Sequence, residues 1–314
     1  MISFGPVPSR RLGKSLGVNN IIAPKTCSFD CVYCQVGRTM RKSIKRVTFF
    51  EPDVIYKNVE QHLSLLKPES HPDYITIVSN GEPTLDINLG KTIKLLKRTG
   101  IPVAVITNAS LLIYDSVKED LHQADWISLK VDAAINDTWC IINRPDKKLD
   151  FEEHLKSIIL FAGEYKGILH TESMIVDGVN DSSEHFTRLT EIIKKTDPHK
   201  AYLSIPVRPP AEKWIKQPDA DKLNMVWQAF NNRHIRTELL TGFEGLDTGS
   251  TGNIYEDILN ITAVHPLRED SLLELLEKDN ADFHVIESLI EQKLIRSTIY
   301  KGKRFFMREY HFNT

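Results

Sequence analysis

The sequence contains no run of 18 or more apolar residues, which a membrane-spanning helix would need. Its first residues, MISFGPVPSRRLGKSLG, also lack the apolar segment of a secretory signal, so we predict a cytoplasmic protein. Four cysteines in 314 residues are too few for a disulfide scaffold. In a reducing compartment, closely spaced thiols more often bind metal or carry out redox chemistry. The hydrophobic content of 41% is ample for a packed core, and the length predicts about two domains.

Positive charge is concentrated in the first 50 residues, although the net charge of the whole chain is only −2. This segment has one acidic residue, Asp30, and nine basic residues, which are Arg10, Arg11, Lys14, Lys25, Arg38, Arg41, Lys42, Lys45 and Arg46. A solvated basic loop explains such a pattern, and so does a surface that attracts an anionic substrate. We predict that residues 10–14 and 38–46 bind RNA, such as tRNA, or another anionic substrate.

Six short apolar segments of strand type alternate with amphipathic stretches of helical period. The expected strands are residues 15–22, 74–80, 101–108, 125–132, 167–176 and 200–207, and the expected helices are residues 52–67, 88–100, 114–124, 151–165, 182–198 and 218–233. Such helices between buried strands fit right-handed crossovers in a parallel sheet. The pattern predicts an α/β fold, either a curved, partly open barrel of six βα units or a doubly wound sheet. In both folds the active site lies at the carboxyl ends of the strands.

The last part of the chain has a different pattern. Residues 241–253 are rich in Gly, Ser and Thr, which is typical of a linker. They are followed by an expected helix, a turn, a second helix and a β-hairpin with its tip at residues 301–303. This order resembles a winged helix. We therefore predict two domains, residues 1–250 and residues 251–314, of which the second is a small winged-helix-like α+β module.

The charge of this module argues against DNA reading. Residues 254–314 contain eight Lys or Arg and eleven Asp or Glu, and Glu287 and Glu291 lie on the helix that would enter the groove. Such a surface repels phosphate, apart from the basic tip formed by Lys301, Lys303 and Arg304. We expect the module to dock a protein or present a substrate rather than to read a DNA sequence.

Three of the four cysteines are crowded into TCSFDCVYC, residues 26–34. Cys27, Cys31 and Cys34 have the spacing C-x3-C-x2-C, whereas structural zinc sites nearly always take four protein ligands. Cys140 lies more than a hundred residues further on, and we expect it to be a small buried hydrophobic residue. Three thiolates are enough to hold three irons of a [4Fe–4S] cluster and leave the fourth iron open to another ligand.

The cysteine loop resembles that of the radical S-adenosylmethionine (SAM) enzymes, in which an aromatic residue precedes the last cysteine, as Tyr33 does here. A second motif agrees, since Gly81-Glu82-Pro83 follows the second expected strand and corresponds to the family's GGEP-type motif, with Asn80 in place of its first glycine. The resemblance implies a partial (β/α)6 TIM-like barrel with a [4Fe–4S] cluster and SAM as cofactors. It also implies a one-electron reductant such as ferredoxin or flavodoxin. Glu82 would accept hydrogen bonds from the SAM ammonium group.

The same resemblance suggests further cofactor-binding residues near the ends of the other strands. These candidates are Thr107, Asn108, Lys130, Asp132, Glu172, Met174, Val176 and Arg208. Several have a structural alternative, because Lys130 and Asp132 could pair with each other and Arg208 could form a salt bridge. Arg10 and Arg11 precede the first expected strand, at the bottom or rim of the barrel.

Three segments, residues 4–18, 206–212 and 261–270, look more narrowly like an Fe–S oxidoreductase branch grouped with the wybutosine-tRNA enzymes. Only Cys140 remains after three cluster ligands, which argues against a second cysteine-ligated cluster. The predicted reaction is cleavage of SAM to a 5′-deoxyadenosyl radical that abstracts hydrogen from RNA or another anionic substrate. The alternatives are modification of a peptide, protein or small molecule, and a non-enzymatic metal-binding winged-helix regulator.

Overall fold

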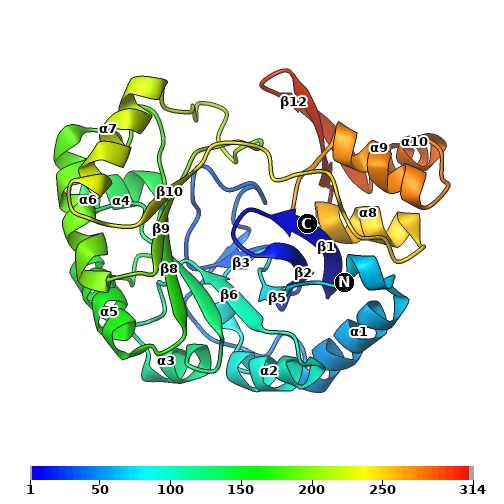
Figure 1. The fold of residues 1–314 in the computed structure, drawn as a ribbon, viewed down its shortest axis with the longest axis horizontal. Coiled ribbons are helices and arrows are strands. Elements are labelled where there is room, and N and C mark those ends of the chain that lie inside the picture. The colour runs from blue at the N-terminus through cyan, green and yellow to red at the C-terminus, as the bar shows by residue number, and fades with distance from the viewer. Residues whose placement is uncertain (1, 311–314) are drawn as a thin grey trace.

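A curled sheet of eight strands forms the centre of the computed structural model, which describes residues 2–310 (Figure 1). In spatial order its strands are β1 (Ser3–Ser9), β2 (Gly13–Val18), β5 (Tyr74–Ile77), β6 (Val103–Thr107), β7 (Trp126–Lys130), β8 (Ile168–Met174), β9 (Lys200–Ser204) and β10 (Thr237–Leu240). Neighbouring strands from β2 to β10 run parallel, and only β1 is antiparallel to its neighbour. The six predicted strands are β2 and β5 to β9, and the partial barrel is confirmed.

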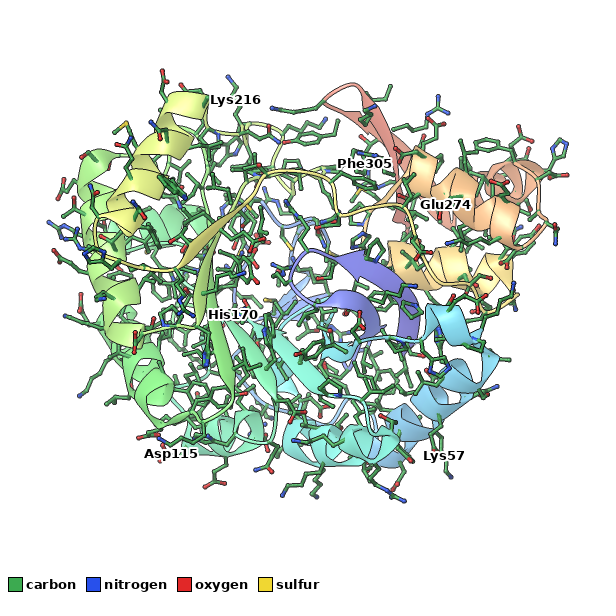
Figure 2. The ribbon with its side chains drawn as sticks, in the orientation of Figure 1. Lys57, Asp115, His170, Lys216, Glu274 and Phe305 are labelled. Atoms are coloured by element: carbon green, nitrogen blue, oxygen red, sulfur yellow. The ribbon has the colours of Figure 1, made fainter. Side chains whose placement is uncertain are left out.

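Helices cover the outer face of this sheet (Figure 1). They are α1 (Pro52–Leu65), α2 (Leu89–Leu96), α3 (Asp115–Leu121), α5 (Phe151–Glu164), α6 (Ser183–Thr196) and α7 (Ala220–Asn231), with 3-10 turns η1 (Pro68–Ser70) and η3 (Lys97–Thr99). The short helix α4 (Asn136–Ile142) packs instead against residues 27–32, and the 3-10 turn η2 (Pro83–Leu85) follows β5. Charged side chains such as Lys57 and Asp115 extend outward from the ring, whereas His170 lies on the sheet (Figure 2). No helix within residues 2–310 is long and apolar enough to cross a membrane.

The two edge strands were not predicted from the sequence. β1 contains Pro6 and Pro8, which lower strand propensity but are tolerated on an edge strand. β10 has the sequence TELL, in which only Leu240 is fully buried, so the apolar pattern of a central strand is missing. Both edges therefore depend on pairing with a neighbour rather than on their own composition.

The predicted linker is packed against the barrel. After β10 the chain crosses to β1, where the Gly249 amide donates to the Pro6 carbonyl at 2.7 Å. A Cβ atom at Gly249 would lie 2.5 Å from Pro6 Cδ, so the two segments approach as closely as glycine allows. Thr248 is buried in the same contact. We call residues 241–252 the strap, because they run from the last strand of the sheet to the first.

The C-terminal segment has the predicted order of helix, turn, helix and hairpin, preceded by one more helix. Its elements are α8 (Ile254–Thr262), β11 (Leu267–Arg268), α9 (Glu269–Lys278), α10 (His284–Glu291), β12 (Ile295–Tyr300) and β13 (Lys303–Arg308), and its sheet has the order β11-β13-β12. Its apolar core includes Phe4 and Val7 of β1, so the segment is packed against the barrel. The division at residue 250 and the winged-helix assignment stay predictions.

Candidate active site

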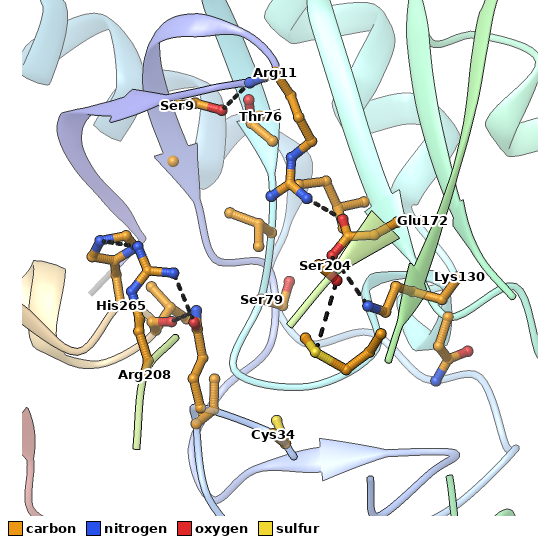
Figure 3. A pocket seen from close by; sticks show the side chains of 18 of the residues that line it. Ser9, Arg11, Cys34, Thr76, Ser79, Lys130, Glu172, Ser204, Arg208 and His265 are labelled. Carbon is orange, nitrogen blue, oxygen red and sulfur yellow. Dashed lines mark hydrogen bonds and ion pairs between the residues drawn. The ribbon is translucent and has the colours of Figure 1, made fainter. Parts of the chain in front are cut away.

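A cavity of about 310 Å³ lies inside the curled sheet, between the strands and the loop that follows β2. Twelve of the sixteen predicted site residues line it, and they are Cys27, Cys31, Tyr33, Cys34, Gly81, Glu82, Thr107, Asn108, Lys130, Glu172, Met174 and Arg208. In Figure 3 the Cys34 and Arg11 side chains lie toward opposite ends of this wall. Strand-end residues that are far apart in the sequence therefore converge, as parallel strands require.

The three thiols of the cysteine loop each have a nitrogen donor from another part of the cavity wall. β3 (Thr26–Cys27) pairs with the exposed β4 (Arg41–Lys42) and holds the start of the loop. The side-chain contacts are Asn108 Nδ2 to Cys27 Sγ at 3.5 Å, Asn143 Nδ2 to Cys31 Sγ at 3.4 Å and Lys25 Nζ to Cys34 Sγ at 3.1 Å. Donors to sulfur stabilise the thiolate form, which is the form that binds metal.

Burial keeps two of these thiols, Cys27 and Cys31, protonated when no metal is present. It raises the pKa of Cys27 to about 12, and burial together with the nearby Asp132 carboxylate raises the pKa of Cys31 further. Metal binding must therefore release protons here. Within residues 2–310 no three His, Cys, Asp or Glu side chains converge on one ion position. The fit of an iron–sulfur cluster rests instead on three thiols that share one cavity and carry N–H donors.

Glu82 lies under the cysteine loop with its carboxylate almost fully hydrogen-bonded. Oε1 accepts from the Thr84 amide at 3.0 Å and from the Thr84 and Thr107 hydroxyls, both at 2.6 Å. Oε2 accepts from the Asn108 amide at 2.8 Å. Burial raises the pKa of Glu82, although these bonds oppose the shift. Because a carboxylate oxygen accepts about two hydrogen bonds, Oε2 can accept one more, from a group in the cavity.

Glycine at position 81 is required by a close approach to the cysteine loop. A Cβ atom there would lie 1.9 Å from the carbonyl oxygen of Thr26, the residue before Cys27. The Glu82 amide donates to the same carbonyl at 3.1 Å. The Gly-Glu-Pro turn and the start of the cysteine loop are thus fixed against each other.

Glu172 on β8 lies between two cations on the cavity wall (Figure 3). It pairs with Arg11 and with Lys130, whose Nζ is 3.2 Å from Oε1, and it accepts a hydrogen bond from the Ser204 hydroxyl at 3.0 Å. Burial alone would raise the pKa of Glu172, but Arg11 and Lys130 outweigh it and lower the value to about 2. This carboxylate is therefore ionised at neutral pH and holds both cations in place.

Asp132 does not line the cavity but lies behind Tyr33. Its carboxylate accepts hydrogen bonds from the Tyr33 hydroxyl, from Asn143 Nδ2 at 2.8 Å and from the Met174 amide at 2.8 Å. Lys130 is close to Asp132 as predicted, at 3.7 Å, and also lies over the Tyr33 ring. Asp132 therefore positions Tyr33, which belongs to the cysteine loop, and Asn143, whose side chain contacts Cys31 in that loop.

Three other predicted residues support the cavity wall from behind. Val176 is fully buried, and its amide donates to Asn180 at 2.8 Å. Asn80 is buried with its amide bonded to Asn19, and Pro83 begins η2. None of the three lines the cavity. Cys140 also differs from expectation, since it is exposed on α4 rather than buried.

Arg10 and Arg11 lie in the turn between β1 and β2, and their side chains line the cavity rather than the barrel's rim. Arg10 is 3.7 Å from Glu244 of the strap, which also pairs with Arg208. Arg208 further donates to Gln35 at 3.2 Å and to His265 Nε2 at 3.1 Å. Arg208 therefore forms the salt bridge that was one of its two predicted roles, and its contact with a cofactor stays a prediction. Sequence reasoning did not find Glu244, His265 or Asn143, because no local motif marks them.

The chain belongs to the radical SAM superfamily, since residues 21–190 match the family described as Radical SAM superfamily. Enzymes of this superfamily use a [4Fe–4S] cluster and SAM, so this chain is an enzyme that uses both. More narrowly, it is 44% identical over 309 residues to the UPF0026 protein MJ1312 of Methanocaldococcus jannaschii, with 98% of this chain and 96% of that protein covered. This similarity places the chain among the UPF0026 proteins.

Two solved structures share the fold. A radical SAM methyltransferase from Sphaerobacter thermophilus superposes with a TM-score of 0.56 at 16% identity, covering 72% of this chain and 66% of that one. The structure of TYW1 with a lysine-pyruvate adduct bound gives a TM-score of 0.54 at 18% identity, covering 71% and 75%. The predicted superfamily, barrel and cofactors are confirmed. Membership of this enzyme superfamily argues against the alternative of a non-enzymatic metal-binding winged-helix regulator.

Proposed function

We propose that Cys27, Cys31 and Cys34 hold the [4Fe–4S] cluster, and that SAM binds in the cavity beside it with its ammonium group on Glu82. When bound, the two cofactors together supply reductive cleavage of SAM and a 5′-deoxyadenosyl radical that abstracts hydrogen. The observation that carries this proposal is the convergence of the three thiols and Glu82 on one cavity. The three nitrogen donors would stabilise the thiolates once the cluster is bound, and the surrounding strands would limit the access of water.

Replacing Glu82 with glutamine is expected to weaken SAM binding about tenfold, because a charge-assisted hydrogen bond becomes a neutral one. The iron content should stay at about four per chain, since the three thiols are unchanged. Equilibrium SAM binding to the anaerobically reconstituted protein measures the effect. Glu69→Gln, in an exposed 3-10 turn, is the control. Equal affinity of both variants and the wild type would show that Glu82 does not contact SAM.

The charge of the cavity supports an anionic substrate. Apart from the three cysteines, whose charge would be shared with the cluster, its lining contains five cations and three carboxylates, which are Arg10, Arg11, Lys25, Lys130 and Arg208 against Glu82, Glu172 and Glu244. An excess of positive charge in an enclosed, weakly polar space favours an anion strongly. The substrate that we propose is therefore an anionic molecule whose reacting part enters this cavity.

RNA is the second candidate, and it is supported by cations outside the cavity. Arg41 and Lys42 form the exposed β4, which pairs directly with the strand that carries Cys27, and Lys45 follows in an exposed position. The other basic residues of the N-terminal segment have partners, namely Glu244, Glu172, Asp247, Cys34, Glu212 and Asp120. An RNA surface would thus be smaller than the sequence indicates.

We expect tRNA binding, if it occurs, to fall steeply between about 50 and 200 mM salt, because bound phosphates release counterions. The triple variant Arg41→Gln, Lys42→Gln, Lys45→Gln should then bind more weakly and show a shallower salt dependence. Filter binding with the cluster intact measures both quantities. If the intact protein binds no tRNA at low salt, a peptide or a small anionic molecule becomes the preferred substrate.

Enzymes of this superfamily also need a reductant, for which we propose ferredoxin or flavodoxin.

A further inference from the structure

A second cavity of about 150 Å³ lies between the strap and the C-terminal segment. It is continuous in its wall with the first cavity, because Pro8, Val207, Arg208, Glu244 and His265 line both. Its far side is formed by the β12–β13 hairpin, whose Tyr300 hydroxyl donates to the Pro206 carbonyl at 2.8 Å. The volume is several times the roughly 30 Å³ that one water occupies in the liquid, so a group of a few heavy atoms fits.

The lining of this second cavity is strongly basic. It contains Arg208, Arg268, Lys301 and Lys303 and a single carboxylate, Glu244. Arg268 has its own partner, Asp270, with 2.6 Å between Nε and Oδ1. The other three cations have only Glu244 between them, and Lys301 contacts the neutral amide of Gln217. Within residues 2–310, Lys301 and Lys303 therefore have no carboxylate partner, and both side chains are exposed to solvent.

The wall shared by the two cavities has one carboxylate, that of Glu244. Glu244 pairs with two guanidinium groups, those of Arg10 and Arg208, and the buried Arg10 Nε has no hydrogen-bond partner among residues 2–310. His265 Nε2 must accept from Arg208, because a guanidinium only donates. Burial, followed by the charge of Arg208, lowers the pKa of His265 to about 3, so this ring is neutral at neutral pH.

We propose that the second cavity binds a phosphate group of the substrate, whose reacting part lies in the first cavity near the three thiols. A phosphate monoester carries about two negative charges at neutral pH, which matches the two uncompensated cations. Lysine and arginine donors suit its three terminal oxygens. The inference rests on the proposed function for the first cavity, and it gives the C-terminal segment the role of completing the substrate site.

The test is calorimetric binding of inorganic phosphate to the reconstituted protein at constant ionic strength set with chloride. The variant is Lys301→Gln, Lys303→Gln, and the matched control is Lys194→Gln, Lys195→Gln on the exposed end of α6, which changes the net charge equally. We expect phosphate affinity to fall about tenfold or more in the hairpin variant, because two charged donors are lost, and to stay unchanged in the control.

Two results would overturn the proposal: no phosphate binding by the wild type, or equal affinity in the hairpin variant and the control. Substrate-independent SAM cleavage, measured in the same preparations, separates this outcome from failure of the proposed function. The hairpin variant should cleave SAM at the wild-type rate, since Lys301 and Lys303 do not line the first cavity. Loss of SAM cleavage in the wild type itself would contradict the proposed function instead.

Discussion

Replacing Cys31 with alanine is expected to remove the iron–sulfur cluster and to lower 5′-deoxyadenosine formation by more than about 100-fold. Loss of a residue that only supports a metal ligand already lowers metal affinity or activity about 10–100-fold. Loss of a ligand itself should therefore have a larger effect. The Cys31 sulfur also accepts from Asn143 Nδ2, so its removal takes away one of the two contacts of that nitrogen and leaves the one to Asp132. Iron content, the visible absorption of the cluster and SAM cleavage measure the effect.

Cys140→Ala is the matched control for this change. Cys140 is exposed on α4 and lies outside the cavity lining. The variant should therefore keep about four irons per chain and the wild-type rate. A loss of iron in Cys140→Ala with retention in Cys31→Ala would require a different set of ligands.

Replacing Gly81 with alanine is expected to disrupt the site through the backbone. The new methyl group would lie 1.9 Å from the Thr26 carbonyl oxygen, so the turn or the strand β3 must move by about 1 Å or more. A misplacement of about 1 Å at a reacting group can lower the rate about 100-fold. The inserted carbon should also lower the free energy of unfolding by about 1–3 kcal/mol. Rate measurements and urea unfolding check the two effects separately.

Gly163→Ala is the control for the glycine change, because nothing lies within 4 Å of a Cβ atom at Gly163 on α5. A helical glycine replaced by alanine should gain about 0.5–1 kcal/mol of stability and leave the rate unchanged. Similar behaviour of the two alanine variants would mean that the close contact between Gly81 and Thr26 has no role in placing Cys27.

The central strands could be predicted because each carries its own apolar pattern. Ile75, Val103 and Leu129 belong to short β-branched or aliphatic runs between helices, and every such run forms a parallel strand. The edges could not be predicted, because β10 is half-exposed and β1 contains two prolines. An edge strand depends on its neighbour, and the identity of that neighbour is a tertiary property.

The residues of the candidate site that follow strands could be predicted, because parallel strands bring their carboxyl ends together. Glu82 and Asn108 stand at strand ends, and the strands bring them together. Charge pairs are different, because a sequence lists charges without their partners. Arg11 was expected to lie at the bottom or rim, yet it pairs with Glu172, which is 161 residues away. Glu244 was assigned only to a linker, although it pairs with two arginines of the cavity.

Anaerobic reconstitution with iron and sulfide, followed by addition of dithionite and SAM, tests the central claim most directly. The three thiols in one cavity predict a brown protein with about four irons per chain that converts SAM to 5′-deoxyadenosine and methionine. A colourless protein that binds zinc and leaves SAM intact would contradict the claim.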